Sequence, residues 1–124
     1  MTEDAHERGM RIRREVLGDA YVDRAVKGTL PQTAEFQEFI TRVAWGEIWA
    51  RPGLDRRMRS CITLTALVAV GRFDELETHI RGARRNGLTT EEIAEVLLQT
   101  AIYCGIPAAN SAFQVFQRVL DDAV

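Results

Sequence analysis

Apolar residues recur at every third or fourth position along most of the chain, which is the spacing of amphipathic helices with one buried face. The stretch from Met58 to Val70 differs, because it is apolar on nearly every side and so predicts a central helix buried on several faces. We predict helices over residues 3–17, 19–26, 33–51, 58–70, 74–87, 89–105 and from 107 onward.

Residues that favour helix ends support the same boundaries. Asp19 and Asp55 are placed to cap helices, and capping boxes are formed by Asp74 with Glu77 and by Thr89 with Glu92. Glycines follow most of the predicted helices, and Pro107 suits the first turn of the last one. No stretch predicts a strand. We therefore predict an all-α bundle, formed by a single domain over residues 1–124 around one hydrophobic core.

Composition narrows the class of protein. Apolar residues make up 46% of the 124 residues and charged residues 27%, as in folded globular proteins. The net charge of -2 argues against a nucleic-acid partner, which would favour a basic surface. The N-terminal segment lacks an apolar signal core, and no run approaches the roughly 20 apolar residues of a membrane span. We expect a cytoplasmic protein without a membrane partner.

Cysteine and lysine usage limits the chemistry further. Cys61 and Cys104 form no C-x-x-C pair, so we expect two reduced, buried thiols. Lys27 is the only lysine, and a Schiff-base mechanism would depend on that single amine. All other basic side chains are arginines, whose planar guanidinium groups suit carboxylate binding.

Three segments, taken in order, carry a family resemblance across most of the chain. They read RREVLGDAYVDRA, EFQEFITRVAWGEIWARPGLDRRMRSCITLTALVAVGR and DELETHIRGARRNGLTTEEIAEVLLQTAIYCGIPAANSAF. This run resembles the γ-carboxymuconolactone decarboxylase family, within the alkylhydroperoxidase-like superfamily. The resemblance implies one family domain over residues 1–124, a fold of packed helices, and a ring-shaped homo-oligomer, usually a hexamer, with active sites near subunit contacts.

One departure from the wider superfamily bears on the chemistry. Its redox members carry a C-x-x-C at the start of the helix after the central one, with a histidine four residues later. Arg72, Glu75 and His79 are at the corresponding positions here. The resemblance therefore implies acid–base and electrostatic chemistry in place of thiol chemistry.

The activity implied by the resemblance is loss of CO2 from 4-carboxymuconolactone, giving 3-oxoadipate enol-lactone in the protocatechuate branch of the β-ketoadipate pathway. The electron pair left behind flows through a conjugated double bond onto the lactone carbonyl, so no cofactor is expected. The site must bind an anionic substrate, stabilise the developing oxyanion and deliver one proton.

Glu75 and His79 are the candidates for proton delivery. They are four residues apart on a predicted helix, so we expect Glu75 to raise the imidazole pKa and fix its tautomer while His79 acts as the acid. The alternative is an ordinary surface ion pair. A metal site is not expected, because the other histidine, His6, is in the N-terminal segment and no ligand set is complete.

Further candidates have both functional and structural interpretations. Glu47 could assist proton transfer or pair with Arg51 at i,i+4 spacing. Tyr103 could donate a hydrogen bond to the lactone or pack near a turn. Arginines of the N-terminal helix are expected on a solvated face, with a contact to a neighbouring subunit as the alternative, namely Arg8, Arg11, Arg13 and Arg14. Trp45 and Trp49, another i,i+4 pair, could contact substrate or serve as core anchors, and the candidates for binding substrate carboxylates are Arg51, Arg59 and Arg72.

Other functions stay open at this point. The same chemistry could act on a related lactone or a β-keto-type acid. A thiol peroxidase-like redox protein would depend on Cys61 and Cys104, which are far apart in sequence. A non-catalytic helical module would lack a concave polar pocket beside Glu75 and His79.

Overall fold

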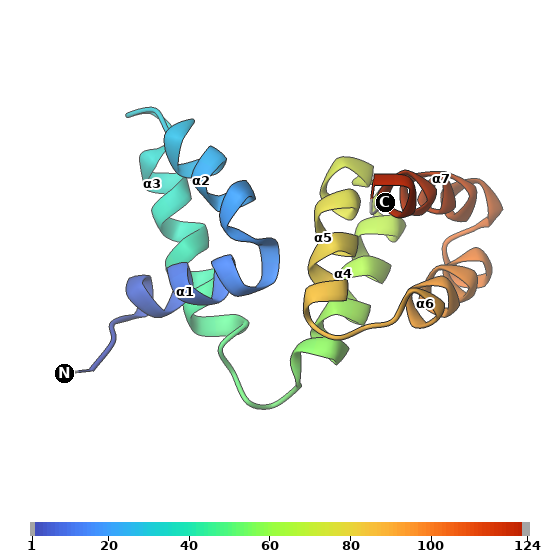
Figure 1. Cartoon of the computed structure of the whole chain (residues 1–124), viewed down its shortest axis with the longest axis horizontal. Helices are drawn as coiled ribbons and strands as arrows, with labels where there is room; N and C mark the ends of the chain where they lie inside the picture. The colour runs from blue at the N-terminus through green and yellow to red at the C-terminus, as the bar shows by residue number, and fades with distance from the viewer. Residues whose placement is uncertain (1, 123–124) are drawn as a thin grey trace. The chain divides into compact units, whose positions relative to one another are not determined.

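The computed structural model describes residues 2–122, and every regular element in that range is a helix (Figure 1). The all-α prediction is confirmed. The chain divides between Asp55 and Arg56 into two compact units, which we call unit 1 and unit 2. Each unit has its own cluster of buried apolar side chains, in place of the one core expected. That the whole chain is a single domain stays a prediction.

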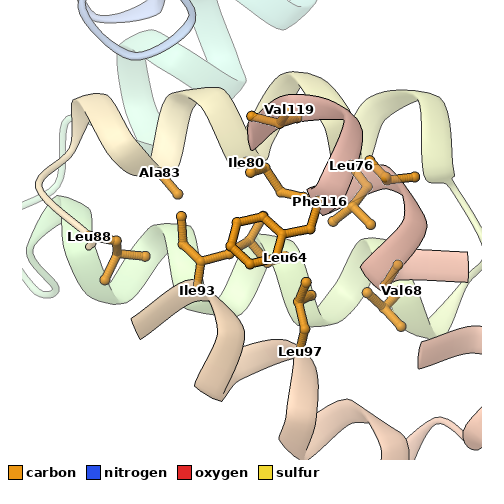
Figure 2. Close-up of a cluster of buried hydrophobic side chains, with 12 residues drawn as sticks. Leu64, Val68, Leu76, Ile80, Ala83, Leu88, Ile93, Leu97, Phe116 and Val119 are labelled. Carbon is orange, nitrogen blue, oxygen red and sulfur yellow. The ribbon is translucent and has the colours of Figure 1, made fainter. Parts of the chain in front are cut away.

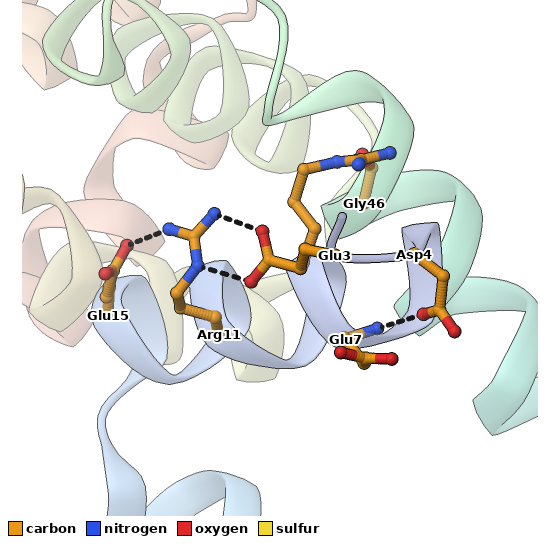
Figure 3. Close-up of polar contacts among 7 residues, drawn as sticks. Glu3, Asp4, Glu7, Arg11, Glu15 and Gly46 are labelled. Carbon is orange, nitrogen blue, oxygen red and sulfur yellow. Dashed lines mark hydrogen bonds and ion pairs between the residues drawn. The ribbon is translucent and has the colours of Figure 1, made fainter. Parts of the chain in front are cut away.

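Unit 1 contains α1 (Ala5–Leu17), α2 (Asp19–Lys27), α3 (Ala34–Phe39) and a π-helix, η1 (Ile40–Ile48). Helix α1 packs against both α2 and η1. Asp4 caps α1, because its carboxylate accepts a hydrogen bond from the Glu7 backbone N–H at 2.8 Å (Figure 3). The buried cluster of this unit consists of Ile12, Val16, Leu17, Val22 and Trp45.

The backbones of α1 and η1 approach each other closely at two glycines. A Cβ atom on Gly46 would lie 2.1 Å from the Ala5 carbonyl oxygen, and one on Gly9 would lie 1.9 Å from that of Thr41. Arg8 completes the contact, since its Nε donates a hydrogen bond to the Gly46 carbonyl at 2.7 Å. Only glycine therefore fits at either position.

The sequence pattern predicted a continuous helix over residues 33–51, and the chain is helical from Ala34 to Ile48, but the second part is a π-helix. The chain leaves the α-helical hydrogen-bond pattern at Ile40 and forms i→i+5 bonds over nine residues. The helical period of the apolar residues does not distinguish these two patterns. The close approach of α1 and the Arg8 bond to a carbonyl of η1 are tertiary contacts that the spacing cannot reveal.

The arginines of α1 do not share one environment. Arg11 forms solvated ion pairs with Glu3 and Glu15, as Figure 3 shows, and Arg14 pairs with Asp19 and Asp23. Arg13 is only 5% exposed, so the prediction of a solvated face is wrong for this residue. The reason is its place on α1, directly after buried Ile12 on the side that faces η1.

Unit 2 contains α4 (Arg56–Ala69), α5 (Phe73–Arg85), α6 (Thr90–Tyr103) and α7 (Ile106–Asp122). Helix α4 packs against the other three. Figure 2 shows Phe116 of α7 among the buried side chains that α4, α5 and α6 contribute. These include Leu64, Val68, Leu76, Ile80, Ile93 and Leu97.

Helix α4 is central in its packing but is not buried on several faces. Leu64 and Val68 are buried, whereas Met58, Ile62 and Val70 are at least half exposed. The prediction from its all-round apolar character is therefore wrong for one face, which no other helix of unit 2 covers. Apolar composition predicts that a surface is covered, but it does not predict which element covers it.

The two predicted capping boxes have different outcomes. The box of Thr89 and Glu92 is present, with the Glu92 N–H donating to the Thr89 hydroxyl at 3.0 Å and the Thr89 N–H donating to the Glu92 carboxylate at 2.9 Å. The box of Asp74 and Glu77 is absent, because α5 begins at Phe73 and its N-cap is Arg72. Asp74 then lies in the first turn, where its negative charge interacts favourably with the positive end of the helix dipole. No helix in residues 2–122 is long and apolar enough to cross a membrane.

Candidate functional site

Arg72 and Glu75 lie together at the start of α5, in a small polar hollow of about 300 Å³. Gly71, which has a φ of 75°, turns the chain from α4 into this helix, and residues 71–75 line the hollow. The Arg72 Nη2 donates a hydrogen bond to the Glu75 carboxylate at 2.7 Å, and this bond is the main cause of the lowered pKa of Glu75. The hollow therefore presents an exposed guanidinium beside an ionised carboxylate.

His79 follows Glu75 by one turn of α5 and is half-buried. Burial lowers the pKa of the imidazole below its ordinary value, because the charged form loses water. The negative charge of Glu75 opposes this shift but is the smaller effect. Glu75 therefore raises the pKa of His79, as predicted, but burial lowers this pKa by more, and the imidazole is neutral at pH 7.

The sequence spacing predicts that Glu75 raises the pKa of His79, but it does not reveal that burial lowers the same pKa. A position four residues away on a helix is visible in a sequence. The depth at which His79 is buried depends on the packing of α5 against α4 and α7. Glu75 also has a closer cation, because Arg72 precedes it by three residues at the start of the helix.

Arg59 lies one turn into α4 and is half-buried. Its neighbour Arg57 has a structural role, since it donates hydrogen bonds to the Gly87 carbonyl and to the Glu92 carboxylate. The bond from Arg57 is the largest of the effects that lower the pKa of Glu92 to about 2. Arg57 therefore connects α4 to the start of α6. Of these two arginines, Arg59 is the candidate for binding substrate.

Four candidates belong to unit 1. Trp45 is buried in its core and stacks on Trp49 with ring centroids 5.1 Å apart, which fits the role of core anchors. Glu47 is exposed and its carboxylate lies 3.9 Å from Arg42, so the predicted pair with Arg51 is not formed. Arg42 and Glu47 both lie within η1, whereas Arg51 lies beyond its end, after the turn at residues 49–50. Arg51 is exposed just after η1.

Tyr103 lines a different hollow from that of Arg72 and Glu75, and the two hollows share no residue. It is 80% exposed at the end of α6. The hollow beside it has a volume of about 660 Å³ and lies between α4 and α6. Its lining is mostly apolar and consists of Cys61, Ile62, Thr65, Ala66, Ala69, Val96, Gln99, Thr100 and Tyr103.

This apolar hollow was not predicted, although one signal for it is present in the sequence. Ile62, Ala66 and Ala69 follow helical spacing on the face of α4 opposite to its buried residues. Cys61 and Cys104 are reduced thiols, as expected, but both are half-buried where full burial was predicted. Within residues 2–122, no group of three or more His, Cys, Asp or Glu side chains could hold a metal ion.

Comparison with known proteins identifies the family. The model of the carboxymuconolactone decarboxylase family matches residues 34–118. The chain is 42% identical to the 4-carboxymuconolactone decarboxylase of Acinetobacter baylyi, over 97% of this chain and 90% of that protein. It is also 44% identical to the nitrosuccinic acid decarboxylase of Metarhizium robertsii, over 94% of this chain and 81% of that one. The chain therefore belongs to the carboxymuconolactone decarboxylase family.

Proposed function

We propose that this protein removes the γ-carboxylate of 4-carboxymuconolactone, releasing CO2 and 3-oxoadipate enol-lactone in the protocatechuate branch of the β-ketoadipate pathway. Family membership and the likeness to the Acinetobacter baylyi enzyme along nearly the whole chain support this activity. The structural observation that carries the proposal is the polar hollow at the start of α5, which Arg72 and Glu75 line, with His79 one turn beyond Glu75 on the same helix.

The reaction needs no external electron acceptor. When the C–C bond to the γ-carboxylate breaks, its electron pair moves into the ring, through the conjugated double bond, and onto the lactone carbonyl oxygen. The resulting dienolate takes up a proton at the α-carbon and becomes the enol-lactone. The protein has to place the substrate, stabilise the negative oxygen and supply that proton.

Arg72 is suited to hold a substrate carboxylate. Its guanidinium is exposed in the hollow and has five N–H donors, of which one already bonds Glu75. The bond to Glu75 orients the planar group, so that the remaining donors can form two parallel hydrogen bonds to a carboxylate. Arg59 and Arg51 are the further arginine candidates, and Tyr103, Trp45, Trp49 and Glu47 remain weaker ones.

His79 is suited to deliver the proton. Its imidazole is neutral in the free enzyme at pH 7, because burial lowers its pKa. The substrate brings two negative charges, which favour the protonated imidazole when they bind nearby. His79 then takes up a proton on binding and gives it to the α-carbon of the dienolate. Glu75 assists by stabilising the charged imidazole between these steps.

The direct test is CO2 release from the lactone by purified protein that has been dialysed against a chelator. We expect full activity without any added metal or organic cofactor. Inactivity that is restored only by a cofactor would refute the proposed chemistry.

Nitrosuccinate is a second candidate substrate, because the chain is 44% identical to a decarboxylase named for that compound. A nitro group can accept the electron pair as the lactone carbonyl does, and a carboxylate remains for Arg72 to bind. Comparing kcat/KM for the two compounds decides between them, and we expect the higher value for the lactone.

We also propose that the protein assembles as a ring-shaped homo-oligomer in the cytoplasm, with six subunits as the expected number. The apolar surface around the hollow between α4 and α6 supports an interface with a second copy, since Ile62 and Tyr103, which line it, are each more than half exposed. Two reduced thiols fit a reducing compartment such as the cytoplasm.

A further inference from the structure

Arg13 is a buried cation on α1, close to the apolar cluster of unit 1. Its exposed fraction is 5%, and the neighbouring residue Ile12 is part of that cluster. Burial lowers the pKa of the guanidinium, which nevertheless stays protonated at neutral pH. Unit 1 therefore contains a positive charge that is largely removed from water.

Among residues 2–122, the acceptors of the hydrogen bonds from Arg13 are two neutral oxygens. Its Nη1 lies 3.3 Å from the Gln37 side-chain oxygen and 3.3 Å from the Thr41 hydroxyl. Both distances are slightly longer than those of good N–H···O hydrogen bonds. The buried Nε has no acceptor among residues 2–122. Arg11 and Arg14 of the same helix, in contrast, have carboxylate partners.

A buried charge with neutral partners alone is unfavourable, because the attraction of an opposite charge does not offset its lost hydration. Gln37 is half-buried on α3, a helix with no fully buried residue, and its amide oxygen faces Nη1. Thr41 donates a hydrogen bond from its own hydroxyl to the Gln37 carbonyl at 2.8 Å. Displacing the Gln37 amide oxygen would therefore leave an Nη1 N–H of Arg13 for another acceptor.

We propose that Arg13 binds a carboxylate supplied from outside the chain, at the position that the Gln37 amide oxygen takes in this structure. The guanidinium has donors left for a planar, two-oxygen anion, including the buried Nε. A small carboxylic acid or an acidic side chain of a second copy has the required chemistry. This site is independent of the proposed decarboxylation.

Thermal unfolding followed by tryptophan fluorescence tests the proposal, because both tryptophans of the chain, Trp45 and Trp49, lie in unit 1. Succinate serves as the probe, against potassium chloride of equal ionic strength. We expect saturating succinate to raise the Tm of the wild-type protein by roughly 5 °C or more. Arg13→Met should abolish this rise, whereas Arg14→Met, the matched control, should keep it.

A second copy as the source gives a different result. The Tm of the wild-type protein then rises with protein concentration in the absence of succinate, and Arg13→Met removes that dependence. The proposal is overturned if neither succinate nor a higher protein concentration raises the Tm of the wild-type protein by more than it raises the Tm of Arg13→Met.

Gln37→Glu provides a test that does not require loss of the arginine. This variant places a carboxylate where the amide oxygen lies, so we expect a higher Tm at pH 7 and no further response to succinate. Adding Arg13→Met should convert the gain into a loss, because the new carboxylate then lacks its cation. A Tm for Gln37→Glu below that of the wild-type protein would contradict the proposal.

Discussion

At the scale of single residues, burial outweighs neighbouring charge at the candidate site. Glu75 is four residues before His79 and raises its pKa, yet the loss of hydration lowers it by more. Glu75 itself is held ionised by Arg72. The three side chains form a graded series along α5, from an exposed cation through an ionised carboxylate to a half-buried neutral imidazole.

Replacing Arg72 by lysine should weaken substrate binding. The ammonium keeps the positive charge but cannot form two parallel hydrogen bonds to a carboxylate. We expect kcat/KM to fall roughly tenfold to a hundredfold, mainly through KM, because a hydrogen bond to a charged group is worth about 1.5 to 3 kcal/mol. Steady-state kinetics measure this, with Arg24→Lys in unit 1 as the control. An unchanged KM would exclude Arg72 from carboxylate binding.

The lowered pKa of His79 should appear in the pH dependence of stability. The unfolded chain binds a proton near the ordinary value of 6.5, whereas the folded chain binds it only at lower pH. Stability is therefore lost as pH falls from about 6.5 towards the folded pKa. Wild-type protein should lose more stability between pH 7 and pH 5 than His79→Gln, as urea unfolding measures. Equal losses would show that His79 is not desolvated.

At the scale of elements, the apolar period of the sequence predicts a helix but not its type, and η1 is a π-helix in close backbone contact with α1. The apolar spacing over residues 33–51 fits an α-helix, but the chain forms η1 where α1 approaches at Gly9 and Gly46. The Arg42–Glu47 contact lies within η1, whereas Arg51, the predicted partner of Glu47, lies beyond its end. Helix type was therefore predictable only as far as Phe39.

Gly46→Ala should destabilise unit 1. The new Cβ would lie 2.1 Å from a backbone oxygen, which cannot move without separating α1 from η1. We expect a loss of about 2 kcal/mol or more in the free energy of unfolding, measured by tryptophan fluorescence in urea. Gly53→Ala is the matched control, because nothing lies within 4 Å of its added Cβ. Equal stability of the two variants would contradict the close contact.

At the scale of the molecule, the sequence predicted the class of fold and the family more fully than the surfaces. Helix ends were readable from local signals such as the Thr89 capping box, because capping depends on neighbours in sequence. The exposed face of α4 and the burial of Arg13 were not, because both depend on contacts between distant segments. Of the candidate site, the i,i+4 spacing of Glu75 and His79 was readable from the sequence, whereas the Arg72–Glu75 ion pair and the separate hollow of Tyr103 were not predicted.

The proposed interface should be sensitive to charge on the face between α4 and α6. Ile62 lines the hollow on this face and is 56% exposed, so Ile62→Glu should leave the fold of the subunit intact. We expect light scattering to give a smaller mass for this variant than for the wild-type oligomer, because an unpaired carboxylate is unfavourable in an apolar interface. Gln117→Glu on α7 is the control. An unchanged mass for Ile62→Glu would show that the interface lies elsewhere.

The proposed mechanism depends most on the imidazole of His79 on α5. The decisive measurement is the rate of CO2 release from 4-carboxymuconolactone by His79→Ala, compared with wild-type protein and with His6→Ala, whose imidazole pairs with Glu38 in unit 1. We predict that His79→Ala folds and loses at least about a hundredfold in kcat, while His6→Ala stays near the wild-type rate. Wild-type turnover by a folded His79→Ala would contradict the proposed mechanism.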